Sequence, residues 1–163
     1  MIRYVLAIVL TTALLGIGVA GVDHAATIRS EQQVETQVAK IESAATSLLE
    51  TEEPTPPGRN GARRVIELDL PGDGFASKPV EMLRIRPDPS GVSIIEYRID
   101  ERVNRTRHVG TIIENQNAGS SNVTDLSGQK GSVTLALSLE STTGGTYRDR
   151  EVYVALRVQS RGR

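Results

Sequence analysis

The hydrophobic positions divide the chain into segments with different spacing, and the first segment is almost continuously apolar. Residues 4–22 contain no charged side chain and are rich in Val, Ile and Leu. A helix of these 19 residues would be roughly 28 Å long, close to the ~30 Å hydrocarbon core of a bilayer. Burying its large aliphatic side chains in lipid would contribute on the order of 15–30 kcal/mol. The pattern predicts a transmembrane anchor over residues 1–22 with the lipid bilayer as its partner.

A buried core helix and a cleaved signal peptide are the alternatives for this segment. The position at the N-terminus disfavours the core helix. Arg3 supplies a short basic region, and Gly18-Val19-Ala20 could serve as a small-residue cleavage site. We favour a retained anchor, because the apolar run exceeds the ~7–15 residues usual for a signal peptide. Arg3 before the span and Asp23 after it predict a single-pass protein with a cytoplasmic N-terminus.

Residues 23–50 keep a helical period but become amphipathic. Their apolar stripe follows heptad spacing and consists of Thr27, Val34, Val38, Ile41, Ala45 and Leu48. No Pro or Gly occurs between Val22 and Glu53, so nothing interrupts a helix before Pro54. The sequence therefore predicts an amphipathic helix that continues the anchor. Its stripe must be covered, either by the β domain of the same chain or by a second copy.

Three prolines and two glycines in residues 51–62 predict an extended linker. After it the period falls to two, which predicts a β-rich extracytoplasmic domain over residues 63–163. Strands are expected at 65–70, 80–86, 92–99, 107–113, 133–140 and 152–158. The last two are the clearest, since each places four aliphatic side chains on one face and mostly polar ones on the other.

This alternation predicts a half-buried antiparallel sheet, with residues 142–149 as a connecting loop. The amphipathic helix is the only long helix available to cover the sheet, so we expect the two to pack together. Residues 115–131 are polar and rich in glycine, which predicts a mobile loop. The fold class is therefore α+β, a long N-terminal helix followed by an antiparallel β-sheet domain.

Composition narrows the chemistry. The chain has no Cys, which excludes disulfides, thiol nucleophiles and thiolate metal sites. The net charge of −1 gives no attraction to nucleic acid, and the arginines of residues 98–107 alternate with acidic residues as on a solvated face. Aromatic residues make up only 3% and Trp is absent, so the core must consist of Val, Ile and Leu.

No catalytic or cofactor motif emerges. His24 and His108 are too far apart to form a recognisable zinc motif, and no Gly-x-Ser-x-Gly sequence occurs. Asp69 and Asp73 flank a Pro-Gly pair, which favours a simple turn over a calcium loop. The chain is therefore expected to be non-enzymatic, with no catalytic residue, no metal site and no cofactor.

Two sequons are candidate glycosylation sites, Asn104-Arg105-Thr106 and Asn122-Val123-Thr124. They would matter only for an exported domain in an organism that N-glycosylates. Asn122 is the better candidate, because it lies in the polar loop.

The order of apolar span, amphipathic continuation of the same helix, joint and antiparallel sheet resembles the type IV pilins and pseudopilins, including the pilin-like proteins of archaea. The resemblance is architectural; the cleavage motif of prepilins is absent, since only Met1-Ile2-Arg3 precedes the apolar tract. It implies a structural or assembly subunit of a surface filament or secretion machine, which self-associates or binds other subunits through its N-terminal helix. Gly16 and Ala20 form a small-residue pair that allows close helix contact. The alternatives are an anchored binding module and a secreted β-rich protein with a cleaved signal peptide.

Overall fold

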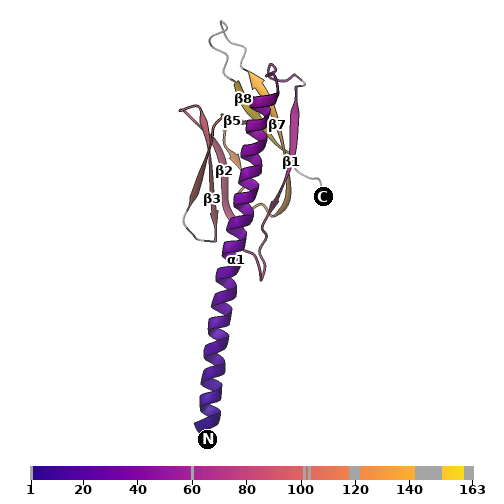
Figure 1. Ribbon diagram of the computed structural model, residues 1–163. Coiled ribbons are helices and arrows are strands. Elements are labelled where there is room, and N and C mark those ends of the chain that lie inside the picture. Colours follow the sequence, from indigo (N-terminus) through magenta and orange to yellow (C-terminus); the bar gives the residue numbers. More distant parts are fainter. Residues whose placement is uncertain are drawn as a thin grey trace.

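One long helix and eight strands make up the described part of the chain, residues 2–59, 61–100, 102, 104–117, 122–141 and 152–159 of a computed structural model (Figure 1). The helix is α1 (Ile2–Thr51). The strands are β1 (Arg63–Leu70), β2 (Val80–Asp88), β3 (Val92–Ile99), β4 (Arg105–Val109), β5 (Ile113–Asn115), β6 (Thr124–Asp125), β7 (Gly131–Ser141) and β8 (Val152–Gln159). The predicted α+β class is confirmed.

Helix α1 is unbroken and joins the predicted anchor to the predicted amphipathic segment. Its first half stands clear of the β domain, and its second half lies against it (Figure 1). All six residues of the predicted stripe are at most 3% exposed. The helix packs against β1, β7 and β3. The stripe is therefore covered by strands of the same chain, which confirms the predicted packing of helix on sheet.

The strands form two four-stranded sheets. The first has the order β1-β7-β8-β5 and the second the order β4-β3-β2-β6. The pairing is antiparallel except between β5 and β8, which run parallel. The antiparallel sheet predicted from the last two strands is confirmed, because β7 and β8 pair antiparallel along their length. The division into two sheets was not predictable, because alternation determines which face of a strand is buried but not which strand it pairs with.

Two predicted segments need correction. The strand expected at 107–113 is two strands in different sheets, with β4 ending at Val109 and β5 beginning at Ile113. The loop expected at 115–131 contains β6, which pairs with β2, followed by Leu126, which is 1% exposed. Apolar burial of Leu126 holds this segment on the second sheet. The predicted loop at 142–149 lies outside the described residues.

The predicted linker is attached to the first sheet. The Thr55 amide donates to the Leu139 carbonyl at 3.2 Å, and the Ser141 amide donates to the Thr55 carbonyl at 3.0 Å. These bonds pair Thr55 with Glu140, in the part of β7 that β1 does not reach, because β1 begins opposite Ser138. The chain therefore leaves α1 and is fixed on the sheet within four residues.

A single aliphatic core lies between α1 and the two sheets. Its fully enclosed members come from all three layers, for example Ile41 of α1, Leu137 of β7 and Ile95 of β3. Tyr97, at 8% exposed, is the one aromatic side chain among the buried core residues that the structure describes. The predicted core of Val, Ile and Leu is confirmed.

Candidate functional site

The first half of α1 exposes its apolar side chains on all sides. Large aliphatic residues from Ile2 to Ile17 are 59–84% exposed. The hydroxyls of Thr11 and Thr12 donate to the carbonyls of Ala7 and Ile8, at 2.8 Å and 2.7 Å, so neither hydroxyl needs water. Among the described residues, α1 is the one helix long and apolar enough to cross a membrane.

A cluster of ion pairs surrounds the point where this apolar surface ends. The Lys78 ammonium lies 2.5 Å from a carboxylate oxygen of Asp23 and 3.7 Å from one of Asp100. The hydrogen bond to Asp23 raises the pKa of Lys78 above its usual value. Asp100 adopts a φ of 43°, which an aspartate tolerates better than most residues. A guanidinium nitrogen of Arg102 lies 3.1 Å from His24 Nδ1. The polar cluster thus joins α1 to the segment between β1 and β2, which carries Lys78, and to the segment between β3 and β4, which carries Asp100 and Arg102.

The connection between β1 and β2 forms a tight turn beside this cluster. The Gly74 amide donates to the Ser77 carbonyl at 3.1 Å, and the Ser77 hydroxyl donates to the Gly72 carbonyl at 2.9 Å. The Lys78 amide donates to Ser30 Oγ at 2.8 Å, which fastens the turn to α1. At the tip is Phe75, the only phenylalanine of the chain, with 87% of its surface exposed.

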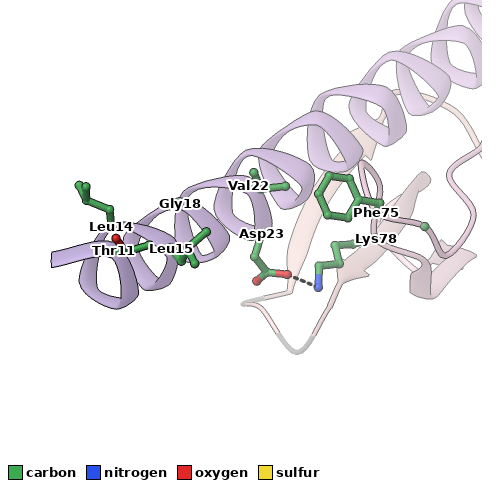
Figure 2. A pocket seen from close by; sticks show the side chains of 9 residues that line it. Thr11, Leu14, Leu15, Gly18, Val22, Asp23, Phe75 and Lys78 are labelled. Carbon is green, nitrogen blue, oxygen red and sulfur yellow. Dashed lines mark ion pairs between the residues drawn. The ribbon is translucent and has the colours of Figure 1, made fainter. Parts of the chain in front are cut away.

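An apolar groove of ≈ 640 Å³ lies between this turn and the helix (Figure 2). Phe75 from the turn and Val22 from the helix both line this groove, as do the two members of the Asp23–Lys78 ion pair (Figure 2). The lining residues are Thr11, Leu14, Leu15, Gly18, Val22, Asp23, Gly74, Phe75 and Lys78. Such a lining suits an alkyl chain, since its two charged groups already neutralise each other.

A smaller polar hollow of ≈ 240 Å³ lies on the outer face of the first sheet, where Gly58, Arg59 and Gly61 of the linker form part of its lining. Glu140 lines this hollow on the outer face of β7, as the strand pattern predicts, but it is only 4% exposed because other groups cover it there. It accepts hydrogen bonds from Gln116 at 2.5 Å, Tyr153 at 3.2 Å and Ser138 at 3.4 Å. Burial, and then the Glu140 charge, raise the pKa of Tyr153 to about 12. A carboxylate held by these donors stabilises the sheet and is poorly placed to act as a base.

The remaining candidates from the sequence are not brought together. The Asp69 carbonyl and carboxylate accept from the Gln33 amide at 3.0 Å and 3.3 Å, which agrees with a turn rather than a cation loop. His24 contacts Arg102, whereas His108 is exposed on β4. No group of three or more His, Asp or Glu side chains within the described ranges is arranged to hold a metal ion.

The two sequons lie at opposite edges of the second sheet. Asn104 precedes the edge strand β4 and Asn122 precedes the edge strand β6, and both asparagines are exposed. Thr106 is also exposed, but Thr124 is 1% exposed and pairs with Ile85. The folded chain therefore presents the whole of the first sequon and only the asparagine of the second.

The sequence reasoning missed Phe75 and Lys78. The available signal was the unusual residue at the turn, because corners of tight turns favour Gly, Pro, Asn, Asp and Ser rather than Phe. The sequence Pro71-Gly72-Asp73-Gly74 marks the turn clearly. What it does not reveal is that the turn lies beside the end of the apolar span.

Comparison with known proteins places the chain in a family without assigning an activity. No curated protein and no solved structure matches it significantly. One family model matches residues 1–156, which include the apolar span, the amphipathic half of α1 and nearly all of the β domain. The match covers most of the chain, so the protein belongs to the family described as a domain of unknown function, DUF7311.

Proposed function

We propose that this protein is a non-enzymatic, membrane-anchored envelope protein that acts as a pilin-like subunit of a surface filament or secretion machine. Its N-terminus lies in the cytoplasm and its β domain outside. The observation that carries the proposal is the division of one unbroken helix. The first half of α1 is exposed and apolar, and the second half buries one face against the strands of the β domain.

The exposed apolar half of α1 requires a lipid environment. Exposed aliphatic surface on every side of residues 2–18 would be strongly unfavourable in water. In a bilayer the same surface is favourable, and the helical backbone satisfies its own hydrogen bonds. The polar cluster around Asp23 and Lys78 then lies at the membrane boundary.

Contact with other helices is the second part of the proposal. Gly16, Gly18 and Gly21 leave open space, since a methyl group at any of them would have no neighbour within 4 Å. Such open positions let a second helix approach closely inside a membrane. The unbroken α1 would hold each β domain in a fixed orientation around the assembled helices.

The chemistry of the apolar groove and of the polar hollow supports a non-enzymatic role. The apolar groove carries only a neutralised ion pair, and the carboxylate of the polar hollow is occupied by three donors. As a binding site, the polar hollow of ≈ 240 Å³ is smaller than the ~300–1,000 Å³ of most ligand pockets.

The test fractionates native membranes and measures the mass of the intact mature chain. We expect the mature chain to retain residues 4–22 and to resist extraction by carbonate. We also expect a Gly16→Cys variant to crosslink to a second copy or a partner, while a Pro89→Cys variant on the exposed distal turn does not. A soluble chain that begins near Gly21 would refute the anchor and support the secreted alternative. An anchored chain without crosslinked partners would refute only the assembly role.

A further inference from the structure

We infer that the turn at residues 74–77 is a second membrane contact, with Phe75 inserted in the lipid interface and a lipid acyl chain in the groove between Phe75 and α1. This inference rests on the proposed anchoring of residues 1–22 and adds to it a site on the β domain. Three features of the turn support it, namely its depth, its exposure and the continuity of its groove with the span.

The depth of Phe75 matches the lipid interface. Phe75 lines the same groove as Val22, the last residue of the uncharged run, and as Asp23, the acidic residue that follows it (Figure 2). If residues 4–22 fill the hydrocarbon core, Val22 lies at the boundary between acyl chains and headgroups. Apolar side chains of surface-bound elements penetrate ~5–10 Å into this region. Phe75 therefore reaches lipid without any movement of the domain.

The exposure of Phe75 lacks an explanation within the chain. The ring is 87% exposed although it is a large apolar side chain, and it occupies the corner of a turn. A hydrogen bond from the Ser77 hydroxyl to the Gly72 carbonyl closes the turn, and one from the Lys78 amide to Ser30 holds it against α1. The ring is thus fixed in the position where it meets lipid, so insertion requires little ordering of the loop.

The groove continues the surface of the span. Thr11, Leu14, Leu15 and Gly18 line it from the helix, and all four belong to the uncharged run. An occupant that touches both Leu14 and Phe75 therefore lies within the bilayer. Asp23 neutralises the Lys78 ammonium, which is the cation in the lining of the groove, so the groove itself does not recruit acidic lipid. An acyl chain of any phospholipid fits this chemistry.

The chain has no cysteine, so a single introduced thiol can report the position of the turn. The full chain carrying Ala76→Cys is placed in phosphatidylcholine vesicles and treated with a membrane-impermeant maleimide. The matched control is Pro89→Cys on the exposed turn at the other end of β2. We expect the thiol at position 76 to react at least roughly tenfold more slowly, because burial of a phenylalanine favours the inserted turn by about that factor. Adding Phe75→Ser should restore the rate of the control.

Each outcome is distinguishable. Equal rates at positions 76 and 89 in protein that resists carbonate extraction would overturn the inference and leave the anchor intact. Protein that washes off the vesicles would overturn the anchor itself. Protection that increases with the protein-to-lipid ratio would assign the groove to a second copy and overturn the lipid contact. Protection that requires phosphatidylglycerol would overturn the apolar basis of the contact.

Discussion

Replacing Ile41 by alanine tests how strongly the β domain depends on α1. Ile41 has no exposed surface and lies at the centre of the buried stripe. The change removes three carbon atoms, worth about 2.4 kcal/mol of transfer free energy at ~0.8 kcal/mol each, and leaves a cavity. Buried Ile-to-Ala changes cost about 2–5 kcal/mol in total. For a domain of this size we expect the unfolding midpoint to fall by roughly 10–15 °C.

The matched control is Ile28→Ala in the same helix. Ile28 is 38% exposed, so the change removes the same atoms from a much less enclosed position. Both variants gain the same helix propensity, so the difference between them reports packing. Thermal unfolding of the full chain in detergent micelles, followed by circular dichroism, measures both. Equal midpoints for the two variants would refute the packing of α1 on the sheets, and a midpoint that depends on protein concentration would indicate a stripe shared between copies.

Three further predictions concern single positions. Gly91 has a φ of 85° and room for a methyl group, so Gly91→Ala should lower the free energy of unfolding in urea by about 1–2 kcal/mol through backbone strain alone. Gly72 also has room but no positive φ, so the control Gly72→Ala should be neutral or stabilising by up to ~1 kcal/mol. The pKa of Tyr153 is raised to about 12 in the folded chain, so the unfolded chain loses this proton first as the pH rises. The free energy of unfolding should therefore fall between about pH 10 and 12. Tyr153→Phe should remove that part of the decrease, and an unchanged pH profile would contradict the raised pKa. In a host that N-glycosylates, Asn104→Gln should remove a glycan that is added to the folded protein. Asn122→Gln should remove a glycan only if Asn122 is modified before β6 pairs with β2. Mass analysis of the two variants measures both losses.

Local patterns predict the elements of this fold well. Heptad spacing identified the buried face of α1, and alternation identified β3, β7 and β8 to within two residues of their ends. The pairing of strands was not predictable in this way. Val109 and Ile113 are both buried and four positions apart, yet one joins β3 and the other joins β8. That choice depends on where the rest of the chain lies, which short-range alternation does not encode.

The candidate site was only partly predictable for the same reason. The apolar span is evident in the sequence, because its signal is a continuous run. The contribution of Phe75 depends on the length of β1 and its position along α1, which together place the turn beside Val22. The bond from Lys78 to Ser30 joins residues 48 positions apart. Such long-range contacts decide whether an exposed aromatic residue faces water or lipid.

If residues 4–22 span a membrane as proposed, the unbroken α1 couples the tilt of that span to the position of the β domain. Thr51 lies 29 residues beyond Val22, about 43 Å along the axis at ~1.5 Å per residue. A tilt of ~20°, ordinary for a single span, would displace the far end of the helix sideways by roughly 15 Å. Bilayer thickness, which sets such tilts, would therefore move the outer surface of the protein by more than the diameter of a helix.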